Sequence, residues 1–165
     1  MTTYLLDANV FMAANRLHYG LDFCPAFWQW LIDGNKAGRV FSIERVASEL
    51  QAGDDALATW ASARGTGFFL KPDAALQSAL GKLATWATSQ RYEPAATSTF
   101  FQVADYYLVA HALAYGYAVV THEVASPSIK RIKIPDACIG VGVTHVTPFE
   151  MLRREKARFI LGPQK

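Results

Sequence analysis

Four acidic residues stand at points of the chain where a shared site could form. Asp7 directly follows a short apolar segment, and Glu123 comes two residues after another. Glu49 and Asp105 lie in segments that are expected to be helical. Carboxylates about 4 Å apart repel by several kcal/mol per pair at an effective dielectric near 20, unless a hard divalent cation lies between them. Oxygen ligands alone suit Mg²⁺ or Mn²⁺, and such a centre can orient a phosphodiester and activate water.

Asp105 is the most informative of the four. At helical spacing it shares one stripe with apolar neighbours, which are Phe101, Leu108, Val109 and Ala112. A carboxylate on such a stripe is costly unless it is paired, protonated or bound to a cation. The alternative is that Asp105 complements the helix dipole, an effect of about 0.3–1 kcal/mol that does not account for its inward direction.

Each of the other acids has an ordinary explanation when it is taken alone. Asp7 can cap the helix that follows it, Glu49 can face solvent, and Glu123 can lie in a solvated loop. No single acid therefore decides the matter, and only the four together indicate a metal centre.

Other familiar site motifs are missing from the sequence. There is no nucleophile elbow, no phosphate-binding loop with Lys and Ser or Thr, and no dinucleotide-binding glycine turn. His122 and Glu123 begin like a zinc-protease motif, but Ser126 stands where the second His is needed.

Short apolar segments alternate with helical ones, and this order predicts how the acids are positioned. Five segments are expected to be strands, namely residues 4–6, 40–41, 68–70, 117–121 and 143–147. The expected helices run from about residue 9, over 25–35, from a cap at Ser42 to about Gly53, over 56–64, over 73–89, from a cap at Ser98 or Thr99 to Tyr115, and from Pro148. The alternation predicts an α/β fold, with a parallel sheet covered on both faces in a single domain over residues 1–165.

Composition narrows the class of protein further. The 165 residues are 52% hydrophobic and carry a net charge of +2, which excludes a disordered chain. The two cysteines, Cys24 and Cys138, are too few for a disulfide framework. Residues 1–129 hold 8 basic and 11 acidic residues, whereas residues 130–165 hold 8 basic and 3 acidic ones. The basic C-terminal part is weak evidence for a polyanionic partner.

The location of the protein is expected to be cytoplasmic. The first residues carry no basic region of a signal peptide. The apolar segment 103–121 contains Asp105, His111 and Gly116, so a buried helix followed by a buried strand explains it better than a membrane span.

The acidic positions and their surroundings together resemble the PIN-domain ribonucleases, in particular the VapC-like toxins of toxin–antitoxin pairs. Four short segments over roughly residues 4–150 carry the resemblance in order, namely YLLDAN at 4–9, SEL at 48–50, ADYYLVA at 104–110 and YAVVT at 117–121. The resemblance implies a three-layer α/β/α sandwich around a parallel sheet of about five strands.

The resemblance also implies roles for individual residues. Asp7, Glu49, Asp105 and Glu123 would hold Mg²⁺ or Mn²⁺ and carry catalysis. Asn9 and Thr121 would orient these ligands by hydrogen bonds. Many family members have Thr-x-Asn after the fourth strand, or an Asp slightly further on, where this chain has Thr-His-Glu. The fourth acid is therefore either Glu123 or Asp136.

The expected reaction is hydrolysis of RNA that leaves a 3′-hydroxyl and a 5′-phosphate, with Asp105 or Asp7 accepting a proton from the attacking water. Two groups of basic residues could hold the RNA backbone, namely Lys130, Arg131 and Lys133, and Arg153, Arg154, Lys156 and Arg158. Tyr106, Phe23 and Trp28 are candidates for stacking on bases, although aromatic residues more often pack in a core. A cognate antitoxin and a homodimer are further expected partners.

Two other functions remain open from the sequence. One is a catalytically silent PIN-fold binding module, which the four filled acidic positions disfavour. The other is a haloacid-dehalogenase-like phosphatase, which needs a second Asp two residues after the first, where this chain has Asn9.

Overall fold

The computed structural model describes residues 1–162, and a sheet of five parallel strands forms its centre. The strands are β1 (Tyr4–Leu6), β2 (Val40–Ile43), β3 (Phe69–Leu70), β4 (Ala118–Val120) and β5 (His145–Val146). Their order across the sheet is β3-β2-β1-β4-β5, and every pairing is parallel. The predicted α/β fold is confirmed.

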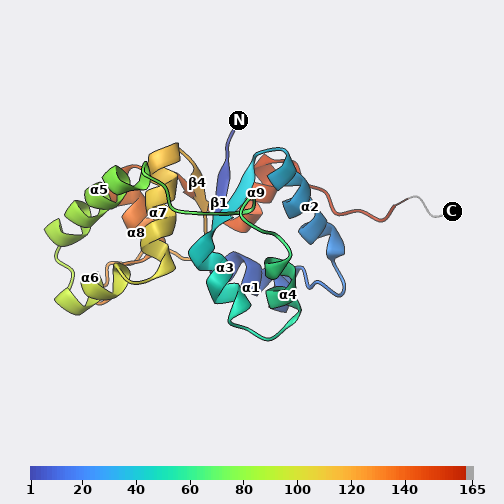
Figure 1. Ribbon diagram of the computed structural model, residues 1–165, viewed down its shortest axis with the longest axis horizontal. Helices are drawn as coiled ribbons and strands as arrows, with labels where there is room; N and C mark the ends of the chain where they lie inside the picture. Colours follow the sequence, from blue (N-terminus) through green and yellow to red (C-terminus); the bar gives the residue numbers. More distant parts are fainter. Residues whose placement is uncertain (163–165) are drawn as a thin grey trace.

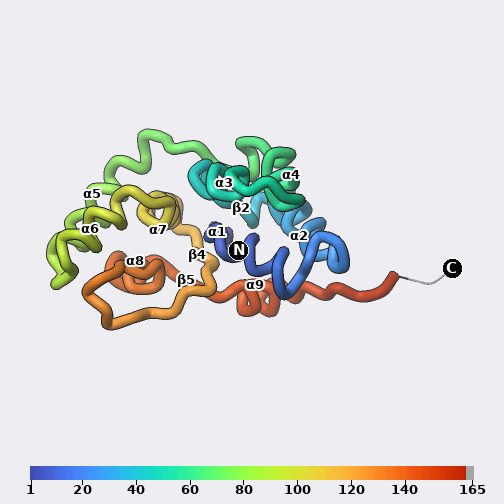
Figure 2. Tube along the Cα trace, turned by 90° about the horizontal axis from the view of Figure 1, so that it is seen from below, coloured from blue at the N-terminus to red at the C-terminus, as the bar shows by residue number. Residues whose placement is uncertain are grey.

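Helices cover both faces of the sheet. They are α1 (Ala8–Ala13) with a π-helical turn η1 (Ala14–His18), α2 (Pro25–Lys36), α3 (Glu44–Gln51), α4 (Ala56–Ser62), α5 (Leu76–Ser89), α6 (Pro94–Phe100), α7 (Ala104–Tyr115), α8 (Ile134–Val141) and α9 (Pro148–Arg154). In Figure 1, α5 to α8 lie to the left of the strands, α1, α2, α4 and α9 lie to the right, and α3 lies below β1. The view from below separates the same two groups (Figure 2). The arrangement is that of a three-layer sandwich.

The order of the strands defines where a site can form. From β1 the chain passes to β2 and β3 on one side, and then crosses to β4 and β5 on the other side of β1. A crevice opens outside the carboxyl ends of the strands at such a change of direction. The pairing of Leu6 with Val120 places the next residues, Asp7 and Thr121, side by side at that crevice.

The core explains why the short strands are stable. Leu5, Leu6 and Val119 are fully buried, as expected for strands that are covered on both faces. Several ends of helices agree with their sequence signals. Asp55 accepts a hydrogen bond from the backbone N–H of Ala58 at the start of α4, and Gly116 ends α7 with a left-handed φ of 72°.

The predicted cap at Ser42 is wrong. Ser42 belongs to β2, which continues to Ile43, and α3 begins only at Glu44. The Ser42 hydroxyl is fully buried and donates to the carbonyl of Leu6, 2.6 Å away. A hydroxyl that can cap a helix is therefore used here to join two neighbouring strands.

The segment before Tyr115 also differs from the prediction. Ser98 and Thr99 do not cap one long helix, because they lie inside a separate helix, α6, which begins at Pro94. The next helix, α7, begins at Ala104 and has no side-chain cap. The break between the two helices places Asp105 in the first turn of α7.

Two further differences concern the bounds of helices. No helix was predicted between the fourth and fifth strands, and the structure shows α8 there. The helix predicted over 73–89 begins at Leu76, because the Asp73 side chain accepts from the backbone N–H of Ala75 in the turn before it. Within residues 1–162, no helix is both long enough and apolar enough to cross a membrane.

Candidate functional site

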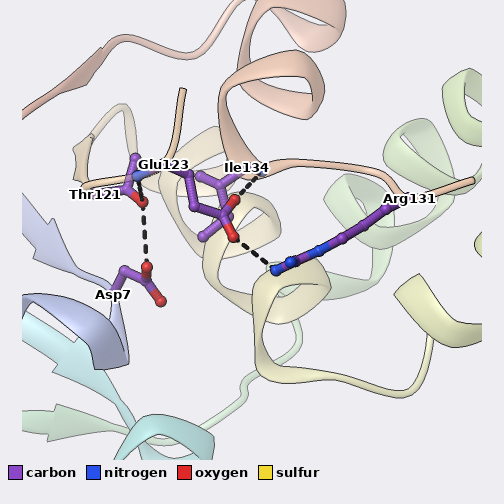
Figure 3. Close-up of polar contacts among 5 residues, drawn as sticks. All are labelled: Asp7, Thr121, Glu123, Arg131 and Ile134. Atoms are coloured by element: carbon purple, nitrogen blue, oxygen red, sulfur yellow. Dashed lines mark hydrogen bonds and ion pairs between the residues drawn. The ribbon is translucent and has the colours of Figure 1, made fainter. Parts of the chain in front are cut away.

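Asp7 lies at the carboxyl end of β1, in the crevice between β1 and β4. Its backbone N–H donates to the carbonyl of Val120, which continues the strand pairing by one residue. The Thr121 hydroxyl donates to the Asp7 carboxylate over 3.1 Å and also accepts from the backbone N–H of Glu123 (Figure 3). The Asp7 side chain is only 7% exposed, so a carboxylate is held in a nearly dry position at the edge of the sheet.

The surroundings of Asp7 make its ionisation costly. Burial, together with the charges of Asp105 and Glu123, raises the pKa of Asp7 to about 7. The hydrogen bonds from Thr121 and from the backbone N–H of Ala8 oppose the rise but do not cancel it. Like charges therefore converge on Asp7, as expected where a cation is to bind or where a proton is to be exchanged.

Asp105 is the second acid of this group and lies in the first turn of α7. Burial raises the pKa of Asp105 to about 6, with further contributions from the charges of Glu123 and Glu49, while the charge of Arg131 lowers it. Glu49 reaches the same region from α3, where it is exposed, and partial desolvation raises its pKa. The structure thus brings Asp7, Asp105 and Glu123 within electrostatic reach of one another, and Glu49 within reach of Asp105.

Glu123 has a second task besides adding charge. One carboxylate oxygen accepts from the Arg131 guanidinium at 2.9 Å, and the other accepts from the backbone N–H of Ile134 at 2.8 Å (Figure 3). Ile134 is the first residue of α8, so the carboxylate also meets the positive end of that helix. Glu123 therefore closes the loop over residues 124–133 and fixes the position of Arg131.

Asp136, the alternative fourth acid, has a different environment. Its side chain accepts from the backbone N–H of Ser126 at 3.0 Å and so anchors the same loop from α8. The charges of Asp105 and Glu123 raise the pKa of Asp7, and the charges of Glu123 and Glu49 raise the pKa of Asp105. The geometry therefore brings Glu123, and not Asp136, to the acids at the ends of β1 and α7.

A cleft of about 420 Å³ opens beside these acids. Its lining includes two acids, Glu49 and Asp105, and two cations, Lys130 and Arg131. The remaining lining is mostly apolar, and consists of Ala96, Thr99, Phe100, Val103 and Ile132. A cleft that is lined by both acids and cations can hold a phosphodiester whose phosphate meets the cations.

The donor set fits a divalent cation of the Mg²⁺ or Mn²⁺ type. The candidate ligands are all carboxylates, and the nearby positive charges are Arg131, which pairs with Glu123, and Lys130 in the lining of the cleft. In the described part of the chain, no three acidic, His or Cys side chains are already gathered at metal-binding distance. A cation held by three of these carboxylates would require them to approach one another.

Other residues singled out from the sequence take less central positions. Asn9 is exposed on α1, and Lys133 directly precedes α8 outside the lining of the cleft. Phe23 is exposed. The stacking role considered for Trp28 and Tyr106 is wrong, because both rings are buried.

The polar atoms of these two rings are used inside the protein. The Trp28 indole N–H donates to the carbonyl of Tyr19, and the Tyr106 hydroxyl donates to the carbonyl of Leu80, each over 2.7 Å.

One basic residue near the site was missed in the sequence. Arg16 lines a smaller pocket of about 160 Å³ that shares Glu49 as a wall. The sequence places Arg16 nine residues after Asp7, but only the π-helical turn η1 decides which way it faces.

The fold and the site define an α/β protein with an acidic centre at the carboxyl edge of a parallel sheet. The sequence matches a family model described as a domain of unknown function (DUF4411) over residues 4–159, and the chain belongs to that family. A search of the curated proteins gives no match.

Proposed function

We propose that the protein is a metal-dependent endoribonuclease of the PIN-like kind. The observation that carries this proposal is the gathering of Asp7, Asp105 and Glu123 at the carboxyl edge of the sheet, with the pKa values of the two aspartates raised towards neutrality. The adjoining cleft adds Lys130 and Arg131, which suit a phosphate backbone.

The residues that would hold the cation are Asp7, Glu49, Asp105 and Glu123. When bound, Mg²⁺ or Mn²⁺ supplies a Lewis acid that polarises the phosphoryl oxygens and makes water a better nucleophile. The side chains must then position the RNA, accept a proton and hold one another in place.

The basic side chains of the cleft bind and orient the RNA. Lys130 and Arg131 contact its phosphates, and Arg131 is kept in position by its ion pair with Glu123. The apolar wall, which includes Phe100 and Ile132, keeps bulk water away from the cleft and strengthens these contacts.

Proton transfer is assigned to the buried aspartates. The pKa values of Asp7 and Asp105 in the metal-free protein are about 7 and about 6, so either carboxylate can exchange a proton near neutral pH when it is not bound to the cation. Water attacks the phosphorus atom in line, the bond from phosphorus to the 3′ oxygen breaks, and the aspartate takes the proton of the water. The 3′ oxygen leaves with a proton from solvent, which gives a 3′-hydroxyl and a 5′-phosphate. Thr121 holds the Asp7 carboxylate in one orientation throughout.

The direct test is cleavage of a labelled single-stranded RNA in Mg²⁺ or Mn²⁺ by the wild type and by Asp105→Asn. Removing one carboxylate from the site is expected to lower the single-turnover rate by at least about 10²-fold, the scale of a lost acid–base group. Asp33→Asn is the matched control, because Asp33 is exposed on α2, and it should cleave at the wild-type rate. Equal rates for the wild type and Asp105→Asn would contradict the proposal.

The same assay separates the other functions that the sequence leaves open. RNA that is bound but never cut would favour a silent binding module. Hydrolysis of a small phosphomonoester without cleavage of RNA would favour the phosphatase, although the residue two positions after Asp7 is Asn9.

The toxin role is a narrower proposal and needs a cellular test. Expression of the wild type is expected to arrest growth, whereas Asp105→Asn should not. A neighbouring gene for a small DNA-binding protein would supply the cognate antitoxin. Equal toxicity of the two proteins would leave the nuclease without a toxin role.

A further inference from the structure

Three aromatic rings gather at the carboxyl edge of the sheet, apart from the cleft. They belong to His18, His122 and Phe149, which stand after β1, β4 and β5 respectively. The ring centroids lie 5.1 Å apart for His18 and Phe149, 5.7 Å for His122 and Phe149, and 5.8 Å for the two imidazoles. Because these strands are parallel, the cluster shares one edge of the sheet with the acids.

The chain over residues 121–123 connects the ring cluster to the acidic site. Thr121 donates to Asp7 and Glu123 contacts Arg131, whereas His122 between them packs against His18 and Phe149. The layers agree with this separation: η1 and α9, which carry His18 and Phe149, belong to one group of helices, and α7 with Asp105 belongs to the other (Figure 1). The rings therefore lie with η1 and α9, and none of them lines the cleft.

The rings are accessible, unlike the aromatic residues of the core. His18 is exposed, and His122 and Phe149 are half-buried, whereas Phe11 and Phe27 are fully enclosed. His18 and Phe149 meet edge to face, with an interplanar angle of 82°. In such a pair one ring keeps both of its faces clear of the other, so a further flat group can stack there.

A positive charge lies beside the cluster. Arg153 is exposed on α9, one turn after Phe149. Burial raises the pKa of Tyr19, whose ring lies 6.2 Å from that of His18, and the charge of Arg153 opposes this rise. Rings with a cation beside them suit a nucleic acid, whose bases stack and whose phosphates meet the cation.

We propose that His18, His122 and Phe149 form a stacking site for an unpaired nucleobase. The proposal rests on the function proposed above, since the RNA chain whose phosphodiester lies at the acids supplies the base. Stacking on the ring cluster and phosphate contacts in the cleft then hold the RNA at two separate places. The site requires an unpaired base but not a particular one, because every base has a face that can stack.

The test measures the affinity for a short single-stranded oligoribonucleotide in Mg²⁺, with every protein carrying Asp105→Asn so that the RNA stays intact. Adding His18→Ala or Phe149→Leu should weaken binding by about tenfold, the effect of one lost stacking contact. Tyr115→Leu is the control, because it removes an exposed ring at the end of α7, next to the amino edge of the sheet. Annealing the oligoribonucleotide to its complement should abolish the difference between the His18→Ala variant and its parent.

The outcomes distinguish this proposal from the nuclease itself. If the parent binds no RNA at all, the stacking site is overturned, and the cleavage assay with the wild type decides the nuclease separately. If the parent and the His18→Ala variant bind single-stranded RNA equally, only the stacking site is overturned, and the cleavage assay still stands. If His18→Ala changes the oligomeric mass but not the affinity for RNA, the rings are a contact between copies of this chain, which also overturns the stacking site. A lower melting temperature in Phe149→Leu alone would be read as a packing defect, and His18→Ala would then decide.

Discussion

At the amino edge of the sheet, Arg39 directly precedes β2 and lies 3.0 Å from Glu155 in an ion pair. At the carboxyl edge, the pKa values of Asp7 and Asp105 are raised, so the ionisation of either carboxyl group is costly. The ion pair at that edge joins Arg131 to Glu123. Opposite charges meet where the chain needs only to hold its elements together. Like charges gathered in a partly dry crevice destabilise the fold, and this cost indicates a functional site.

The largest expected effect comes from removing the ionisable group of Asp7, which is buried and lies near like charges. The pKa of Asp7 is about 7 in the folded protein against an ordinary value of 3.8, so between these values the folded state holds a proton that the unfolded state has lost. Stability from this group is therefore fully present below pH 4 and is lost as the pH rises through 7. The free energy of unfolding of the metal-free protein should fall between pH 5 and pH 8, and this fall should be smaller by roughly 2–3 kcal/mol in Asp7→Asn.

Urea unfolding in a chelator at the two pH values measures this difference. Glu155→Gln at the amino edge is the control and should keep the wild-type dependence on pH over this range. A fall that is as large in Asp7→Asn as in the wild type would contradict the pKa assigned to Asp7.

The second effect concerns the choice of the fourth acid. Glu123→Gln should weaken the binding of Mn²⁺ at least tenfold, because the substitution removes a charge that acts on both Asp7 and Asp105. Asp136→Asn should change the affinity for Mn²⁺ by less than about twofold, since its side chain accepts a hydrogen bond from the backbone N–H of Ser126. Calorimetric titration of both variants with Mn²⁺ makes the comparison, and the reverse order of effects would make Asp136 the fourth acid.

The smallest effect is expected at the amino edge. Arg39→Gln breaks the ion pair with Glu155, whose partners are 36% and 16% exposed, and should lower the free energy of unfolding by about 0.2–1 kcal/mol. Added salt should reduce this difference further. A loss of several kcal/mol, or a change in the rate of RNA cleavage, would show that the two edges do not differ as described.

The elements with strong local signals could be predicted from the sequence. Asp7 after an apolar segment, Gly116 after a helix and Asp55 before one are signals within a few residues, and β1, the end of α7 and the start of α4 follow from them. α8 escaped notice because it is short, almost wholly apolar and contains Pro135 and Gly140, so it has no helical period of polar residues. α6 was missed because Pro94 suggested a loop rather than the first turn of a helix.

The acids of the candidate site could be named from the sequence, whereas their arrangement could not. Residue type and position along the chain pointed to Asp7, Glu49, Asp105 and Glu123. The ion pair of Glu123 with Arg131 and its hydrogen bond to Ile134 depend on how a loop of ten residues closes, which no local pattern encodes. For the same reason the sequence could not choose between Glu123 and Asp136, whose roles separate only when α8 is in place.

The central claim is that the acids of the carboxyl edge hold a divalent cation, and the most direct measurement is the free energy of unfolding as a function of Mn²⁺ concentration. At 100 times its dissociation constant, Mn²⁺ should stabilise the wild type by about 2.7 kcal/mol. The same concentration should leave Asp105→Asn nearly unchanged, while Asp33→Asn responds as the wild type does. A wild type that gains no stability from Mn²⁺, or an Asp105→Asn variant that gains as much, would contradict the account.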